Sequence, residues 1–212
     1  MIETIDWGLI EYKQAWDKQK ALVEEVQKNR NDGFLVFCEH PSVITIGKSG
    51  TINNVLKTKE FLQANGIALY ENDRGGDVTL HNPGQLVVYP IINLSNFKED
   101  LHWFLRKIEE AIIQLIKLYG IIGSRISNLT GVWIEDSRKI AAIGMHCSRW
   151  VTSHGLALNV NNDISEFDFI IPCGITEKTV CSMKSELNKN ISIDELKVKF
   201  NDIFQQIMSD LS

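Results

Sequence analysis

Residues 130 to 160 carry the sequence feature that most restricts how this chain can fold. Three β-rich runs follow one another there without a helical period, over 132–134, 140–147 and 151–160. The connections between them are only a few residues long. Antiparallel strands can be joined in this way, whereas parallel strands need a crossover of about a dozen residues or more. The segment therefore predicts an antiparallel meander.

Helical patterns lie before and after this meander. Apolar residues recur at three- and four-residue spacing in three long stretches, and a shorter helix is also expected: 9–26, 101–119, 193–211 and 57–64. A capping-box spacing at 96–99 precedes the second long stretch, which ends at Gly120. The same spacing at 192–195 precedes the third. The chain therefore carries predicted helices at both ends and in the middle.

The remaining β-rich runs complete the predicted sheet. Two of them, 34–38 and 43–46, are interpreted as strands paired with each other, and three more follow at 67–70, 78–80 and 86–92. Together these elements predict an α+β fold, with helices packed on a mixed, largely antiparallel sheet. The 212 residues contain no linker or internal repeat, so we expect a single domain over residues 1–212.

Composition and charge exclude several classes of protein. The chain has 22 Lys and Arg against 27 Asp and Glu, a net charge of −5, which argues against nucleic acid as a partner. Its four cysteines form no C-x-x-C pair, which disfavours disulfide frameworks, zinc ribbons and redox shuttles. The apolar run 86–92 is far shorter than the ~20 residues of a membrane helix. An acidic N-terminus lacks the basic region of a signal peptide, so we expect a cytoplasmic protein that does not bind membranes.

Two glycine-bearing segments are candidates for binding. Residues 74–85 hold three glycines, an arginine and a histidine between two predicted strands, and paired glycines let another molecule lie against bare backbone. Most loops of this kind are simply tight turns. In the second segment, Lys139 precedes a run that is apolar on both faces, where a lysine is usually a charge reaching water. The small residues Ala141, Ala142 and Gly144 in this run leave room for an elongated group such as an acyl chain.

Cys173 differs from the other three cysteines. Cys38 and Cys147 lie in apolar runs, where thiols behave as small hydrophobes, and Cys181 is assigned a structural role. Cys173 lies between proline and glycine at a bend, where a thiol can be held partly exposed. A thiol with a pKa of ~8.5 is only slightly ionised at neutral pH, so a nucleophilic cysteine needs a base or cation nearby. The five histidines and Lys139 are the candidates.

Taken together, these motifs resemble the lipoyl(octanoyl) transferase family. The resemblance is carried by ordered blocks that cover most of the chain: Arg74-Gly75-Gly76 through Thr79 and His81, Pro83-Gly84-Gln85, Gly131-Val132-Trp133, Lys139 to Gly144, 148–155, 157–160 and 171–175. It implies a fold like that of the biotin and lipoate ligase catalytic domains. It also implies an acyltransferase of lipoate biosynthesis, which moves an octanoyl or lipoyl group from the phosphopantetheine thioester of acyl carrier protein to a lysine of lipoyl domains. The acceptors are those of 2-oxoacid dehydrogenases and the glycine cleavage H protein, and no further cofactor is expected.

The resemblance also implies roles for individual residues. In the family, the cysteine matched by Cys173 carries the acyl group as a thioester, and the lysine matched by Lys139 assists it. The residues implied to line the substrate site are Arg74, Gly75, Gly76, Asp77, Val78, Thr79, Leu80, His81, Ala142, Ile143, Gly144, Gly155, Leu156 and Ala157. Leu80 and Asn82 stand where the family often has tyrosine and glycine, a departure that bears on acyl-chain length more than on chemistry.

Three alternatives fit parts of the same pattern. An ATP-dependent lipoate-protein ligase of the same fold would form an acyl-adenylate, but Pro83-Gly84-Gln85 stands where its glycine-asparagine pattern is expected, and 212 residues leave no room for an accessory domain. A cysteine amidotransferase would move the acyl group between two carrier domains. A non-catalytic acyl-binding module would use Lys139 only as a surface charge.

Acidic carrier domains would need a local basic surface on a chain of net charge −5. Arg74, Arg138 and Arg149 are the first candidates for such a surface.

Overall fold

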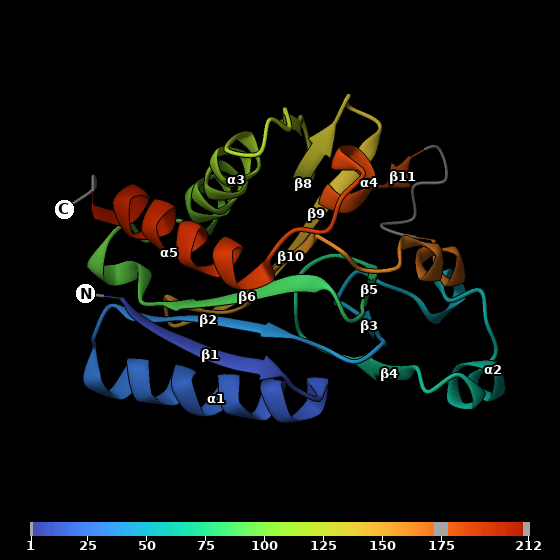
Figure 1. Cartoon of the computed structure of the whole chain (residues 1–212). Coiled ribbons are helices and arrows are strands. Elements are labelled where there is room, and N and C mark those ends of the chain that lie inside the picture. Colours follow the sequence, from blue (N-terminus) through green and yellow to red (C-terminus); the bar gives the residue numbers. More distant parts are fainter. Residues whose placement is uncertain (1, 172–177, 210–212) are drawn as a thin grey trace.

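The computed structural model describes residues 2–171 and 178–209, which form two β-sheets and the helices around them (Figure 1). The large sheet has the strand order β1-β2-β6-β10-β9-β8-β7, with β11 paired to β9, and the small sheet has the order β4-β3-β5. The strands of the large sheet are β1 (Glu3–Leu9), β2 (Gly33–Glu39), β6 (Gln85–Ile92), β7 (Ser124–Ile126), β8 (Leu129–Ile134), β9 (Arg138–Ser148), β10 (Val151–Asn159) and β11 (Thr179–Val180). Those of the small sheet are β3 (Val43–Ile46), β4 (Ala68–Glu71) and β5 (Val78–His81).

Helices cover both faces of the large sheet (Figure 1). Helix α1 (Tyr12–Asn29) packs on one face, where Ala15 and Val26 meet apolar residues of β2 and β6. Helices α3 (Leu101–Lys117) and α5 (Ile193–Ser209) pack on the other face, over the larger core. The shorter helices are α2 (Lys59–Ala64), α4 (Met183–Leu187) and the 3₁₀ turns η1 (Ile52–Asn54), η2 (Leu94–Asn96) and η3 (Ile164–Phe169). The predicted α+β fold, a mixed sheet with packed helices, is confirmed.

The predicted antiparallel meander is confirmed as β8, β9 and β10. Strands β9 and β10 are joined at Arg149 and Trp150, which both have positive φ, 50° and 63°. A two-residue turn of this kind matches the twist of the strands on either side of it. The resulting register places Gly155 opposite Gly144 and Ala157 opposite Ala142.

The prediction that 34–38 and 43–46 pair with each other is wrong. Strand β2 lies between β1, to which it is parallel, and β6, to which it is antiparallel. Strand β3 belongs to the small sheet, between β4 and β5. Both strands are apolar and almost wholly buried, so their side chains carry no alternation that selects a partner.

The N-terminal ends of two helices differ from the predicted ones. Helix α1 begins at Tyr12 rather than at residue 9, because residues 3–9 form the edge strand β1. Helix α3 is capped by Asp100, whose carboxylate accepts a hydrogen bond from the N–H of Trp103 at 2.9 Å, and not by the 96–99 spacing. At α5 the cap is as predicted: Ser192 Oγ accepts from the N–H of Glu195 at 3.3 Å. No helix within the described ranges is long and apolar enough to cross a bilayer.

Candidate functional site

A cavity of about 570 Å³ lies against β9, β10 and the loop that leads into β5. All of the predicted lining residues border it except Leu80, and Lys139 borders it as well. Leu80 is fully buried in the core of the small sheet, so its assignment to the lining is wrong. The leucine that stands here where the family often has tyrosine therefore does not change the wall of the cavity.

The floor of this cavity is built from cross-strand pairs of small residues. Ala142 lies opposite Ala157, and Gly144 lies opposite Gly155, on adjacent antiparallel strands. Residues two apart on a strand face the same side, so these four positions share one face of the sheet. A trough without large side chains follows, as predicted from Ala142 and Gly144. Ala141, the third residue of that prediction, lies in the larger core and does not border the cavity.

Arg74 braces the loop beside this trough. Its guanidinium donates to Thr45 Oγ1 at 3.1 Å, to Thr45 O at 2.7 Å and to Asp77 O at 2.6 Å. The side chain is buried, with only 7% of the residue exposed. Arg74 therefore holds the loop to β3 from inside the protein, and it is not part of a surface on which a partner could dock.

Close backbone contacts explain the glycines around this loop. A Cβ on Gly47 would lie 2.3 Å from the carbonyl oxygen of Gly76, and a Cβ on Gly144 would lie 2.6 Å from that of Gly75. Gly75 also donates its N–H to Met145 O at 2.9 Å, and Gly76 has φ +87°. The loop thus reaches the sheet only where side chains are missing.

Lys139 lies at the cavity wall, with 7% of the residue exposed. Its Nζ is 4.6 Å from the centre of the Trp133 ring, whose face attracts a cation. Lys178 places its own Nζ 5.2 Å from the same ring, but it does not border the cavity. Lys139 is therefore a buried amine that faces the cavity, not a charge reaching water.

A buried chain of hydrogen bonds ends at His81, another residue of the cavity wall. Asn159 Oδ1 accepts a hydrogen bond from Gln85 Nε2 at 2.9 Å, which leaves Gln85 Oε1 to accept from His81 Nδ1 at 2.7 Å. Burial, and secondarily the nearby His40, lower the pKa of His81 to about 3. His81 is therefore neutral at physiological pH, with its proton on Nδ1 and its Nε2 as a hydrogen-bond acceptor.

Tyr12 and His154 are lining residues that the sequence prediction of the site missed. Tyr12 stacks on His81 with ring centres 6.1 Å apart, and burial raises the pKa of Tyr12 to about 12. His154 Nε2 lies 2.8 Å from Asp73 Oδ1, which fixes the residue before Arg74. His154 belongs to the block 148–155 quoted for the family resemblance, but spacing alone did not show that it or Tyr12 reaches the cavity. Leu101 and Leu105, one turn apart on α3, had no signal other than helix periodicity.

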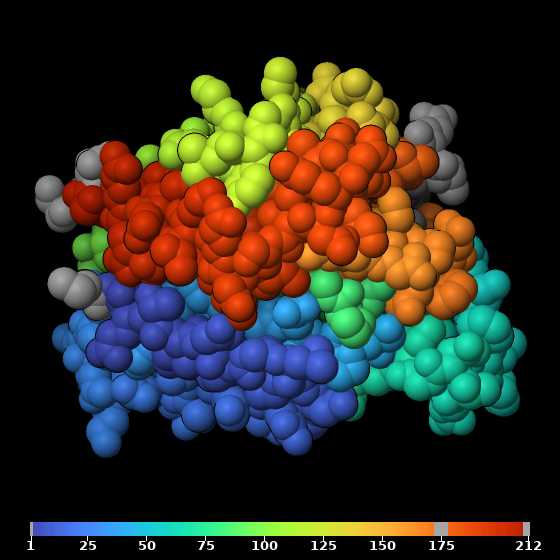
Figure 2. All heavy atoms as spheres, viewed as in Figure 1, coloured from blue at the N-terminus to red at the C-terminus, as the bar shows by residue number. Residues whose placement is uncertain are grey.

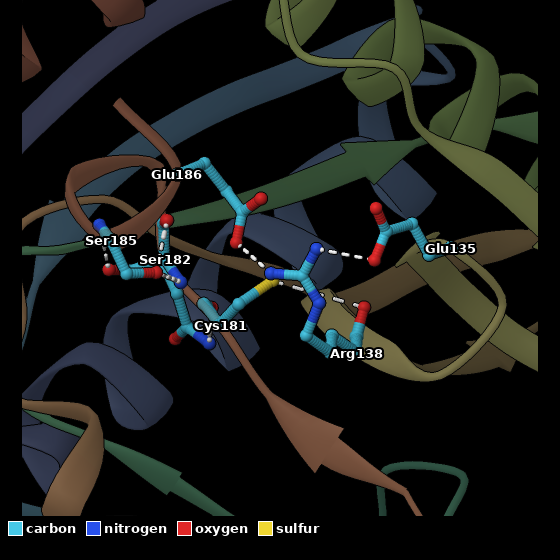
Figure 3. A network of polar contacts seen from close by, with 7 residues as sticks. Glu135, Arg138, Cys181, Ser182, Ser185 and Glu186 are labelled. Atoms are coloured by element: carbon cyan, nitrogen blue, oxygen red, sulfur yellow. Dashed lines mark hydrogen bonds and ion pairs between the residues drawn. The ribbon is translucent and has the colours of Figure 1, made fainter. Parts of the chain in front are cut away.

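Three cysteines lie within the described residues, and burial raises the pKa of each. The shift is large for Cys38, while Cys147 is only half-buried. Figure 3 shows the third, Cys181, beside Glu186; burial first and this carboxylate second raise its pKa to about 12. All three thiols are therefore protonated at neutral pH, in agreement with the structural roles predicted for them. Cys173, the predicted nucleophile, lies outside the described residues.

Arg138, like Arg74, is bound by other residues of the protein (Figure 3). It donates to Glu186 and, at 3.0 Å, to Glu135 Oε2, so its charge is already neutralised. Of the three arginines predicted as docking candidates, only Arg149 is exposed and outside any ion pair among the described residues.

Comparisons with known proteins agree with this geometry. A family model described as "Lipoyl protein ligase A/B catalytic domain" matches residues 11–205. An octanoyltransferase of Cytophaga hutchinsonii is 47% identical over 210 residues, which cover 91% of this chain and 86% of that protein. A bi-partite lipoate protein ligase of Thermoplasma acidophilum, described with its E2 lipoyl domain, has a TM-score of 0.76 at 17% identity, covering 98% and 84% of the two chains. Biotin protein ligase from Aquifex aeolicus, in complex with biotin and ATP, has a TM-score of 0.58 at 13% identity, covering 99% and 72%.

Proposed function

The chain belongs to the lipoyl protein ligase A/B catalytic domain family, and we propose from this that it is an octanoyltransferase acting in protein lipoylation. It takes an octanoyl group from the phosphopantetheine thioester of acyl carrier protein and attaches it to a lysine of a lipoyl domain. Cys173 carries the acyl group between the two steps, Lys139 assists it, and no cofactor is consumed.

In the first step, the Cys173 thiolate attacks the thioester carbonyl. The new C–S bond forms as the old one breaks, and the phosphopantetheine sulfur leaves and takes up a proton from the Lys139 ammonium, which becomes a neutral amine. The negative oxygen of the intermediate needs N–H donors. The N–H of Gly75 is already bound to Met145 O, whereas that of Gly76, on the cavity wall, has no acceptor among the described residues. We assign Gly76 as a donor.

In the second step, the amine of the acceptor lysine attacks the Cys173 thioester. An amide bond forms, the cysteine sulfur leaves as a thiolate, and the attacking nitrogen gives up a proton. A neutral amine at Lys139 is a suitable base for that proton. Lys139 therefore stabilises the thiolate as a cation in one half of the cycle and accepts a proton in the other.

The observation that carries this proposal is the trough beside Lys139. A saturated acyl chain is stabilised by burial against apolar surface at about 0.8 kcal/mol per methylene, provided that nothing fills the space. The alanine and glycine pairs leave that space, and a buried amine borders the same cavity. A reactive thioester held next to an amine is the arrangement that acyl transfer needs.

The test is to incubate the protein with octanoyl-acyl carrier protein in the absence of ATP. An octanoyl adduct that hydroxylamine removes is expected in the intact mass, and addition of a lipoyl domain should discharge it. If transfer required ATP, the ligase would be the better assignment. If the protein bound the donor without forming an adduct, the non-catalytic module would be favoured.

A substitution in the trough should shorten the preferred acyl chain. In Ala142→Leu, the larger side chain occupies space opposite Ala157 that the last methylenes of the octanoyl group need. We expect the ratio of kcat/KM for butanoyl over octanoyl carrier protein to rise roughly tenfold, the value of about two methylenes of lost burial. Because both rates are measured on one variant, the ratio is insensitive to partial unfolding. An unchanged ratio would show that the acyl chain lies elsewhere.

A further inference from the structure

Exposed apolar side chains lie on η1, on α2 and on the segment between them, outside the cavity. Ile52, Leu56 and Phe61 are 48%, 54% and 39% exposed. Figure 2 shows this part of the chain, in teal, projecting from one end of the molecule. A groove of about 730 Å³, lined in part by Ile52, Lys59 and Leu62, opens beside it. Large exposed apolar residues that cluster in this way are typical of a protein–protein contact.

The charge of this surface is opposite to that of the whole chain. Residues 41–71 contain Lys48, Lys57 and Lys59 against two acids, Glu60 and Glu71, which gives this segment a charge of +1 while the net charge of the protein is −5. Glu71 lines the groove. No carboxylate within the described ranges forms an ion pair with any of the three ammonium groups. Lys57 is held above the rings of Phe61 and Phe169, 5.3 and 5.4 Å from their centres. The surface is thus basic and apolar, and complementary to an acidic partner with an apolar contact.

Hydrogen bonds connect this surface to the cavity. Ser49, next to Lys48, borders the cavity, and its N–H donates to Gly76 O at 3.2 Å. Asn54 donates through Nδ2 to the carboxylate of Asp77, another lining residue, at 2.7 Å. Ile52, Leu56 and Phe61 themselves do not border the cavity. A partner bound here therefore sits to one side of the cavity rather than over it.

We propose that the surface formed by Ile52, Leu56, Lys57, Lys59 and Phe61 docks the acyl-donor carrier protein. The proposal rests on the proposed function and names the partner for one of its two steps. A donor carrier presents its thioester on a long phosphopantetheine arm, which can span from a docking surface beside the cavity into it. An acceptor lysine reaches only the length of its four-carbon side chain, so a lipoyl domain must bind at the cavity mouth. The anionic phosphate of the arm would pass near Lys48, the exposed lysine that precedes Ser49.

The test compares Lys57→Glu/Lys59→Glu with a matched control, Lys117→Glu/Lys189→Glu, which reverses two exposed lysines elsewhere on the chain. Binding of holo-acyl carrier protein is measured by calorimetry, and transfer is measured with octanoyl-acyl carrier protein and with octanoyl-pantetheine, which has no carrier. For the first variant we expect a roughly tenfold weaker Kd and higher KM for the carrier donor, with a shallower salt dependence. Rates with octanoyl-pantetheine should match those of the wild type, as should all values of the control.

Three results would overturn the docking surface: carrier binding unchanged in the first variant, equal losses with both donors, or a raised KM for the lipoyl domain alone. Carrier binding that weakens as expected, in a protein that transfers from neither donor, would instead refute the proposed function and leave the docking surface standing. Leu56→Gln, which removes apolar surface from a half-exposed position, gives a second variant that preserves the charges.

Discussion

Replacing Cys173 with alanine is expected to abolish octanoyl transfer, with kcat reduced by a factor on the order of 10⁴ or more. The described thiols cannot take over, because burial raises the pKa of Cys38, Cys147 and Cys181 and keeps them protonated at neutral pH. A protonated thiol is a poor nucleophile. The measurement is the intact mass after incubation with octanoyl-acyl carrier protein, together with the rate of lipoyl-domain acylation.

Cys147→Ala is the matched control, since Cys147 is the least buried of the described cysteines. This variant should acquire the adduct and transfer it at the wild-type rate. An adduct that persists in Cys173→Ala and disappears in Cys147→Ala would identify Cys147, on β9, as the nucleophile. Loss of the adduct in both variants would point to damage of the fold, which a thermal melt of each variant would reveal.

The trough is the part of the site that local sequence could predict. Ala142 and Gly144 indicated an unfilled slot, whereas Gly155 and Ala157 entered the prediction only through the family resemblance. The two-residue connection at Arg149 and Trp150 sets the register between their strands. Once that register is set, alternation puts all four positions on one face. The prediction for Leu80 was wrong because all residues of the motif from Arg74 to His81 were assigned to the cavity lining. Val78 and Leu80 lie two residues apart on one face of β5, in the core of the small sheet, but only Val78 also reaches the cavity.

Contacts between distant segments could not be predicted. Arg74 is satisfied by the carbonyl and hydroxyl of Thr45, 29 residues earlier, so its burial depends on where β3 lies against the loop. Strands β2 and β3 are apolar on both faces and therefore equally suited to either sheet. The edge strand β1 exposes most of its side chains, which left no hydrophobic pattern to find. In each case the structure of a segment depends on the distant segment that it contacts, which its own sequence does not reveal.

Replacing Lys139 with alanine is expected to have the second-largest effect, a fall in kcat of about 10²–10⁴ and slower alkylation of Cys173 by iodoacetamide at neutral pH. Reference pKa values of ~10.4 for lysine and ~8.5 for cysteine favour the ammonium–thiolate pair over the neutral pair by roughly 2.6 kcal/mol in water. Removing the amine removes this stabilisation. Lys178→Ala is the matched control, because Lys178 lies over the same Trp133 ring but does not border the cavity. An unchanged alkylation rate in Lys139→Ala would exclude Lys139 from activation of the thiol.

Lys139→Arg separates the two roles assigned to this side chain. A guanidinium keeps the positive charge and the contact with an aromatic face, but it stays protonated at any pH a protein tolerates and cannot act as a base. Cys173 in this variant should still be alkylated and acylated, whereas discharge of the octanoyl group to the lipoyl-domain lysine should fall about as far as in Lys139→Ala. Single-turnover measurements of the two steps distinguish these effects. The second step needs a proton acceptor, which arginine is not. If Lys139→Arg transferred the octanoyl group to the lipoyl domain at the wild-type rate, Lys139 would have an electrostatic role only.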